Sequence, residues 1–205
     1  VIPQEWEVRK MSEICSKIFV GIATSTTEYF SDNGIPLLRN QNIREDKLDT
    51  KDLQYITDEF SNANKTKLLR EGDILTVRTG YPGISCVVKK EFEGAQTFTT
   101  LISRPILGII NSVYLSKYIN SDIGKKILNN LKAGGAQQNL NVTSFQTLAV
   151  IVPPLPEQQK IAEILSSVDD HIEKLDETIS EYELLKKGMM KKLLTEGIGH
   201  IEFKD

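Results

Sequence analysis

The spacing of apolar residues changes near residue 153 and divides the chain into two regions. Before this point, short apolar runs rich in β-branched residues alternate with polar segments, a pattern typical of strands joined by loops. The runs predict strands at 35–38, 73–77, 84–88, 99–102 and 148–152. Between these runs, the sequence predicts a short helix over 62–70 and a longer one over 113–131, which Gly134 and Gly135 would end. The first region is therefore predicted to be a mixed α/β domain with loop-rich connections.

After the proline cluster at 153–156, apolar residues recur in alternating steps of four and three. Such a seam is typical of a coiled-coil helix. Pro156 suits the first turn of a helix and Glu157 suits its positive end. We expect one helix from 156 to about 195, on the order of 60 Å long at 1.5 Å per residue. The predicted seam, which continues less regularly past Lys186, consists of Ile161, Leu165, Val168, Ile172, Leu175, Ile179, Tyr182 and Met189.

An apolar stripe of this length requires a partner, and no second long helix is predicted in the chain. One alternative is that the seam packs on the first domain, although such packing could cover only part of the stripe. The fold class is accordingly α+β, with a domain over 1–153 followed by a long C-terminal helical region over 154–205. We expect the seam to mediate dimerisation.

Composition limits the class of protein. With 205 residues, of which 40% are hydrophobic, the chain can bury a sizeable core. Cys15 and Cys86 are too few for a disulfide framework and too far apart in sequence for a metal-ligand pair, so we expect reduced thiols in a cytoplasmic protein. No apolar run is long enough to span a membrane, and the N-terminal residues lack the pattern of a signal peptide.

The net charge of −3 is unevenly distributed. Residues 156–205 hold 7 Lys/Arg and 12 Asp/Glu, a net charge of −5. Of the chain's 25 basic and 28 acidic residues, this leaves 18 and 16 in residues 1–155, a net charge of +2. The first region is thus the better candidate for contact with DNA. Its modest charge predicts weak non-specific binding, so strong binding would depend on a partner or on base contacts.

Sequence patterns for catalysis and metal binding are absent. His171 and His200 have no neighbouring cluster of ligand residues, and no phosphate-binding loop or nucleophile elbow is present. The segment 80–83 resembles a glycine-rich loop but lacks the lysine that such a loop needs, so we interpret it as a turn. We therefore expect no metal site and no catalysis by this chain alone.

Four polar segments carry side chains that can contact DNA. Arginine can form paired hydrogen bonds with guanine, and asparagine or glutamine can do so with adenine. Each segment could instead be a solvated loop whose residues only form turns. The candidates are Thr24, Ser25 and Thr26; Arg39, Asn40, Gln41, Asn42 and Arg44; Arg78, Thr79 and Tyr81; and Gln137, Gln138 and Asn139.

One segment carries a specific resemblance. Residues 153–165, which read PPLPEQQKIAEIL, resemble the conserved helical region of Type I restriction-modification specificity subunits. The similarity extends through SSVDDHI at 166–172 and KKGMMKKLL at 186–194. Upstream, IPQEWEV at 2–8, GDIL at 72–75 and GGAQQNL at 134–140 are similar to other parts of the family. Together these segments cover nearly the whole chain.

The resemblance implies a non-catalytic subunit that selects the DNA sequence for its partners. These are methyltransferase subunits, which bring S-adenosylmethionine and methylate adenine, and a separate restriction subunit. Family members usually carry two recognition domains separated by two antiparallel helices, whereas this chain has one of each. It is either a half subunit that self-associates or a fragment of a longer protein, and its start at Val1 favours missing N-terminal residues.

Our hypothesis from this departure is an antiparallel homodimer, paired through 161–193, that recognises a split palindrome. The half-sites would lie at most one to two DNA turns apart, because a turn is about 34 Å. An alternative function is a coiled-coil scaffold whose α/β domain binds another protein. A third, a methyltransferase in its own right, is disfavoured because the chain lacks a Gly-rich turn after an early strand and an Asn-Pro-Pro-aromatic element.

Overall fold

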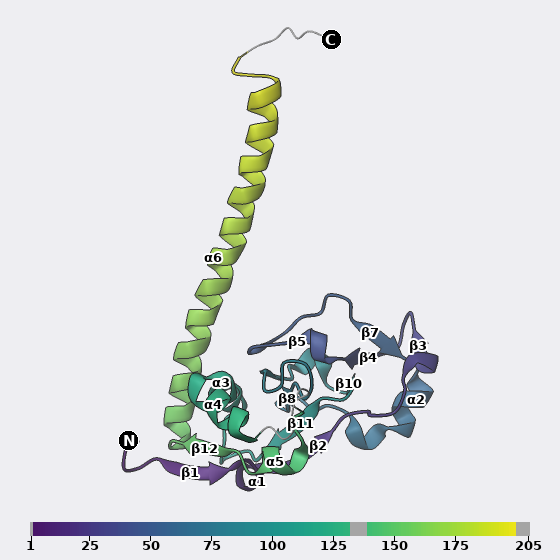
Figure 1. Ribbon diagram of the computed structural model, residues 1–205, viewed down its shortest axis with the longest axis vertical. Helices are drawn as coiled ribbons and strands as arrows, with labels where there is room; N and C mark the ends of the chain where they lie inside the picture. The colour runs from purple at the N-terminus through teal and green to yellow at the C-terminus, as the bar shows by residue number, and fades with distance from the viewer. Residues whose placement is uncertain (1, 132–138, 200–205) are drawn as a thin grey trace. The chain divides into compact units, whose positions relative to one another are not determined.

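The structure, a computed structural model, describes residues 2–131 and 139–199 (Figure 1). It consists of a compact first unit that ends at Ala162 and a second unit that begins at Glu163. The helices are α1 (Met11–Ile14), α2 (Asp58–Ala63), α3 (Ser112–Asn120), α4 (Asp122–Leu131), α5 (Val142–Gln146) and α6 (Leu155–Thr195). The strands are β1 (Glu7–Lys10), β2 (Cys15–Val20), β3 (Phe30–Ser31), β4 (Ile35–Leu38), β5 (Ile43–Arg44), β6 (Lys47–Leu48), β7 (Gln54–Ile56), β8 (Ile74–Thr76), β9 (Ser85–Val87), β10 (Gln96–Thr97), β11 (Leu101–Pro105) and β12 (Ala149–Val152).

The first unit contains two four-stranded sheets and two short strand pairs. One sheet has the order β2-β11-β8-β9 and is antiparallel throughout. The other has the order β10-β4-β7-β3, in which only the β10–β4 pair is parallel. Figure 1 shows α2 with this second sheet at one end of the unit, and α3, α4 and the β1–β12 pair at the other. The mixed α/β architecture with a long C-terminal helix confirms the predicted fold class.

The apolar side chains of the first unit are buried within it. The largest cluster includes Met11, Leu115, Phe145 and Val150, which are all fully buried, and it extends to Ala162 in α6. A second cluster lies under the β8–β9 hairpin, and a third lies under β4 and β7. Burying a large aliphatic or aromatic side chain contributes about 1.5–3 kcal/mol, so these clusters contribute strongly to the stability of the first unit.

A buried ion pair connects β11 of the β2-β11-β8-β9 sheet to the residue before β8. The Nε and Nη2 atoms of Arg104 in β11 each donate to a carboxylate oxygen of Asp73 at 2.8 Å. The Asp73 side chain is 1% exposed and that of Arg104 17%. The hydrogen bonds that Arg104 donates to Asp73 raise the pKa of Arg104, so the guanidinium stays charged. Removing either partner would leave a charge without a counterion in a largely desolvated position.

The first turns of α6 belong to the core of the first unit. The Gln158 side chain is fully buried; its Oε1 accepts from the Asn111 backbone N–H, and its Nε2 donates to the carbonyls of Ile109 and Pro153. The indole of Trp6 donates to Glu157 at 3.0 Å. Glu157 and Gln158 thus attach the start of α6 to the rest of the first unit.

The predicted strands at 35–38, 73–77, 84–88, 99–102 and 148–152 correspond to β4, β8, β9, β11 and β12. The helix predicted over 62–70 was wrong in position. Helix α2 begins earlier, at Asp58, because the Thr57 hydroxyl accepts from the Phe60 N–H and caps it. It is followed by a 3₁₀ turn over Lys65–Lys67.

The single helix predicted over 113–131 was also wrong, because it is two helices that meet at Ser121. Ser121 is extended (ψ 161°), and its hydroxyl donates to the Tyr118 carbonyl at 2.7 Å. A Cβ atom on Gly124 would lie 2.2 Å from the same carbonyl oxygen, so this close turn requires glycine. The four-residue spacing of apolar residues over 113–131 therefore continues through Ser121, so this spacing does not indicate where the helix breaks.

The second unit contains the rest of α6, whose apolar seam is exposed. The seam residues from Leu165 to Met189 are between 43% and 67% exposed. Ile161 differs, because it lies in the first unit and packs partly buried against its largest cluster. From Leu165 onward, the seam presents an uncovered apolar face, as a helix that packs against a partner would.

Candidate nucleic-acid interface

Hydrogen bonds join two of the four predicted DNA-contacting segments to each other and to Leu140, which follows the predicted residue Asn139. The Nδ2 of Asn40, just after β4, donates to Thr79 Oγ1 at 2.9 Å, which joins it to the turn between β8 and β9. In the same turn, Arg78 and Leu140 bond in both directions: Leu140 N donates to Arg78 O at 3.0 Å, and Arg78 Nε donates to Leu140 O at 3.2 Å. We call residues 39–44, 78–83 and 139–140 the loop cluster.

Several side chains of the loop cluster are free to meet a ligand. Gln41, Arg44 and Asn139 are exposed, and Tyr81 is 81% exposed. The Arg44 side chain is 51% exposed and contacts only Asp49, at 3.3 Å, among the described residues. Residues 80–83 form the expected turn, in which Gly80 and Gly83 have positive φ angles. The cluster thus presents hydrogen-bonding and aromatic side chains on a framework of strand ends.

Two of the predicted contact residues, Asn42 and Thr26, are buried in the structure. Asn42 is fully buried; its Nδ2 donates to the Asp49 and Lys51 carbonyls and its Oδ1 accepts from the Arg39 N–H. Thr26 is 5% exposed. Their polar character serves the loops themselves, since asparagine and threonine also stabilise turns. Thr24 and Ser25 are exposed, and no hydrogen bond within the described ranges joins them to the loop cluster. Gln137 and Gln138 lie outside the described residues.

Arg39 and Asn40 each have one buried polar atom without a partner. The Nη2 of Arg39 donates to the Asp52 carbonyl at 2.9 Å, but its Nε has no hydrogen-bond partner within residues 2–131 and 139–199. The same is true of Asn40 Oδ1. Most buried polar atoms in proteins have a hydrogen-bond partner from the protein or from water. Arg39 Nε can therefore donate, and Asn40 Oδ1 can accept, one further hydrogen bond.

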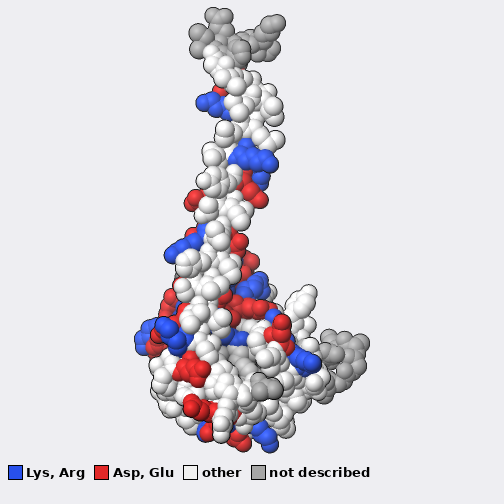
Figure 2. Space-filling view, turned by 90° about the vertical axis from the view of Figure 1, so that its left-hand side faces the viewer, with Lys and Arg blue, Asp and Glu red and all other residues white. Residues whose placement is uncertain are grey.

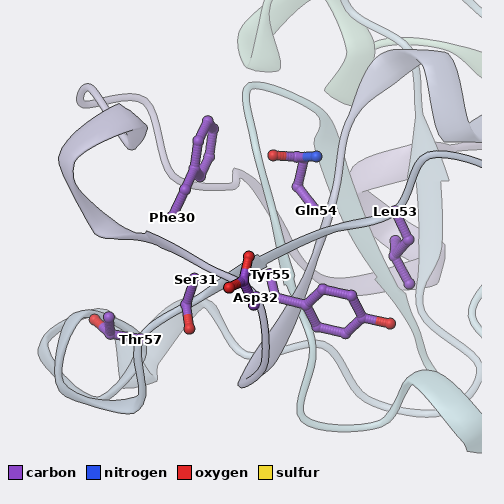
Figure 3. A pocket seen from close by; sticks show the side chains of 7 residues that line it. All are labelled: Phe30, Ser31, Asp32, Leu53, Gln54, Tyr55 and Thr57. Carbon is purple, nitrogen blue, oxygen red and sulfur yellow. The ribbon is translucent and has the colours of Figure 1, made fainter.

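An open pocket of about 640 Å³ lies along β3 and β7 (Figure 3). Its lining combines two aromatic rings with polar side chains. Beside it, the rings of Tyr29 and Phe60 stack at a centroid distance of 3.9 Å. The lining residues are Phe30, Ser31, Asp32, Leu53, Gln54, Tyr55 and Thr57. The pocket thus presents polar and aromatic side chains on the sheet that contains β3 and β7.

The structure offers little for metal binding or thiol chemistry. No group of three or more His, Cys, Asp or Glu within the described ranges is arranged to hold a metal ion. Burial, with a smaller contribution from the Asp46 charge, raises the pKa of Cys86 to about 12. Burial, with a smaller contribution from the Asp73 charge, likewise raises the pKa of Cys15 to about 12. Both thiols are therefore protonated and unreactive near neutral pH. Within the described ranges, none of the helices has both the length and the apolar character that crossing a bilayer demands.

The predicted dimerisation residues lie on one face of α6, and charge is polarised along the helix. Residues 163–183 contain eight Asp/Glu and one Lys, whereas 184–195 contain four Lys and no acidic residue. Figure 2 shows these charges flanking a largely uncharged face. Near its C-terminal end, this face forms a groove of about 560 Å³ lined mainly by Tyr182, Leu185, Met189, Met190, Leu193 and Leu194.

Comparisons with known proteins agree with this arrangement. A sequence model described as Type I restriction modification DNA specificity domain matches residues 3–182. The type I restriction enzyme MjaX specificity subunit of Methanocaldococcus jannaschii is 31% identical over an alignment of 217 residues. The alignment covers 99% of this chain and 49% of that protein. The MjaVIII specificity subunit of the same organism is 27% identical, over 95% of this chain and 46% of its own length. This chain thus spans about half the length of the curated relatives it matches.

A solved structure shows the same fold. The crystal structure of the HsdS subunit from Thermoanaerobacter tengcongensis matches with a TM-score of 0.64 at 14% identity. The match covers 99% of this chain and 52% of that one.

The polar residues of the loop cluster could be identified from the sequence. That their loops lie next to one another in the fold could not be predicted from it. Residue chemistry also did not identify Asp46, Ser85 and Asn120, whose hydrogen bonds connect the segments next to these loops. It did not identify Gln158 either.

Proposed function

This chain belongs to the Type I restriction modification DNA specificity family, and from this premise we propose that its loop cluster recognises a DNA sequence. The observation that supports this most directly is the Asn40–Thr79 hydrogen bond. It brings together polar loops from two sheets, with Gln41, Arg44 and Tyr81 exposed around it. Arginine and glutamine can recognise base edges in the major groove, and tyrosine can pack against bases or sugars.

The chain would act as the non-catalytic specificity subunit of a cytoplasmic complex. Methylation would belong to partner methyltransferase subunits, which would supply S-adenosylmethionine, and cleavage to a restriction subunit. The net charge of +2 over residues 1–155 supports dependence on partners, because few phosphate contacts give little non-specific affinity. Selective binding would therefore be strongest in the assembled complex.

The proposal extends to an antiparallel homodimer through α6. Two observations support it: the seam is exposed from Leu165 to Met189, and the helix is acidic over 163–183 but basic over 184–195. Antiparallel pairing places the basic segment of each helix beside the acidic segment of the other, whereas parallel pairing opposes like charges. Two identical domains would then recognise a split palindrome.

DNA recognition is tested with Arg44→Ala, which removes an exposed arginine of the loop cluster. The chain, assembled with methyltransferase subunits, is used to select sites from a random pool of duplex DNA. We expect the wild-type complex to enrich a bipartite sequence and Arg44→Ala to lose preference at one position of each half-site, by roughly tenfold or more. Arg70→Ala, which removes an exposed arginine outside the cluster, should retain the preference. A wild-type complex that enriches no sequence would refute the proposal.

Orientation is tested by pulsed electron spin resonance on labels at Ser167→Cys or Ser180→Cys, both exposed positions. In an antiparallel pair centred near residue 179, labels at 180 lie close together. Labels at 167 lie roughly 30–40 Å apart, from 1.5 Å per residue. Equal short distances at both positions would show a parallel pair, and a strict monomer in light scattering at tens of micromolar would exclude the dimer. The two natural thiols are buried and should not take up the label.

A further inference from the structure

A single buried amide connects residues that lie just after two segments of the loop cluster, 39–44 and 78–83. Asn120, the last residue of α3, is 7% exposed. Its Oδ1 accepts from the Ser85 N–H at 2.9 Å, and its Nδ2 donates to the Ser85 carbonyl at 2.8 Å and to Asp46 Oδ1 at 2.9 Å. Ser85 begins β9, directly after the turn that carries Tyr81, and Asp46 lies in the β5–β6 turn, two residues after Arg44.

Asp46 is fixed by further contacts. It has a φ of +60°, a left-handed conformation that aspartate tolerates better than most residues. Its N–H donates to the Ser85 carbonyl at 2.9 Å, and its Oδ1 also accepts from Ser116 Oγ at 2.7 Å. The ammonium of Lys117 lies 3.6 Å from Oδ2. Both turns are thus attached to α3 and to each other through the same few atoms.

We propose that Asn120 is a positioning residue for DNA recognition, which sets the distance between Arg44 and Tyr81. This inference rests on the proposed function of the loop cluster. The site requires one acceptor and two donors from one short side chain, which a neutral carboxamide supplies and a carboxylate does not. In Asn120→Asp, both donors are lost and a second negative charge faces Asp46. The β5–β6 turn should then move away from the β8–β9 turn.

Gln158 provides a matched control, because its amide has the same chemistry in another part of the first unit. It is fully buried, accepts from one backbone N–H and donates to two carbonyls. Gln158→Glu should destabilise the unit as Asn120→Asp does, since each leaves buried polar groups unpaired. A positioning role predicts that only Asn120→Asp changes which bases are preferred within a half-site.

The experiment selects sites from a random pool of duplex DNA with the methyltransferase-assembled complex, then measures competition between the preferred site and singly substituted sites. We expect Asn120→Asp to reduce discrimination on the order of tenfold at the positions contacted by the cluster. The double variant Asp46→Asn with Asn120→Asp restores a donor–acceptor pair between the two side chains and should recover part of it. Gln158→Glu should keep the wild-type preference.

The outcomes separate this inference from the proposed function. A wild-type complex without any sequence preference refutes both. If the wild-type complex has a sequence preference and Asn120→Asp retains it unchanged, the inference alone is refuted. The same holds if Gln158→Glu loses as much of the preference as Asn120→Asp does. If Asn120→Asp does not assemble, Ser116→Ala decides, because it removes only one hydrogen bond to Asp46. It should lower discrimination about two- to fivefold, and unchanged discrimination would refute the positioning role.

Discussion

The first unit and the helix of the second unit differ in where their apolar side chains are buried. Met11, Leu115 and Phe145 are fully enclosed by the first unit itself. Along α6, by contrast, Ile172 is 52% exposed and Ile179 56%. At about 1.5–3 kcal/mol for each large side chain removed from water, a partner that covers this face would gain substantial free energy. The first unit therefore buries its apolar side chains within itself, whereas the apolar face of α6 would be buried only by the proposed partner helix.

The largest expected effect follows from disrupting the helix face alone. Replacing Ile172 and Ile179 with aspartate places four charges at the centre of the proposed dimer. We expect the dissociation constant to rise by at least about a thousandfold, because each buried unpaired charge costs several kcal/mol. Size-exclusion chromatography with light scattering should show a monomer at tens of micromolar.

The control for this variant is a pair of exposed helix residues that do not belong to the seam. Thr178→Asp and Ser180→Asp add the same charge to the same segment. They should leave most of the dimer intact, and thermal unfolding of the first unit should be unchanged in both variants. A double-isoleucine variant that remains dimeric would show that α6 does not pair through this seam.

A second prediction concerns the ion pair inside the first unit. Asp73→Asn leaves the guanidinium of Arg104 without a counterion in a mostly buried position, so we expect a loss of about 3–5 kcal/mol in the free energy of unfolding. Urea denaturation followed by tryptophan fluorescence measures this. Asp32→Asn, an exposed carboxylate, should change stability little. If Asp73→Asn is equally mild, the core does not depend on this pair.

Alkaline pH should weaken the first unit and spare the helix. Burial raises the pKa of both cysteines from 9.0 to about 12, so the folded unit favours the protonated thiols. This contribution is fully present below pH 9.0 and decreases as the pH rises from 9.0 towards 12. The loss is about 1.4 kcal/mol per thiol and pH unit. Urea midpoints measured between pH 8 and 10 should therefore fall. A Cys15→Ala, Cys86→Ala variant should show a flatter dependence, and equal slopes would contradict this explanation.

The parts of the fold that could be predicted from the sequence are those with a regular pattern of apolar residues over a short stretch of the chain. The strand of β8 was predictable from consecutive apolar residues, and α6 from its seam, because both patterns arise from local periodicity. Strand β1 was not, since Glu7–Lys10 is mostly polar and owes its pairing to β12, about 140 residues later. The break at Ser121 depends on one hydroxyl and one glycine within an otherwise regular spacing.

The candidate site shows the same division. Residue chemistry indicated Arg44 and Tyr81, which are exposed, but it gave Asn42 the same role, although Asn42 is buried. Asparagine serves equally well in base recognition and in stabilising a turn, and only its surroundings distinguish the two. The convergence of Asn40 with Thr79, 39 residues apart, depends on how two sheets pack. No local pattern specifies that packing.

The smallest expected effect concerns charge rather than burial along α6. In an antiparallel pair, Lys191 and Lys192 lie beside the acidic segment 163–183 of the second copy. Exposed ion pairs are worth about 0.2–1 kcal/mol each, so reversing both lysines to glutamate should raise the dissociation constant roughly tenfold. Analytical ultracentrifugation measures this, and the difference should shrink in 1 M salt because screening is then strong. Lys51→Glu with Lys65→Glu makes the same change in net charge on the exposed surface of the first unit and should leave pairing unaltered. If both double variants weaken the dimer equally, net repulsion rather than the polarity of the helix governs association.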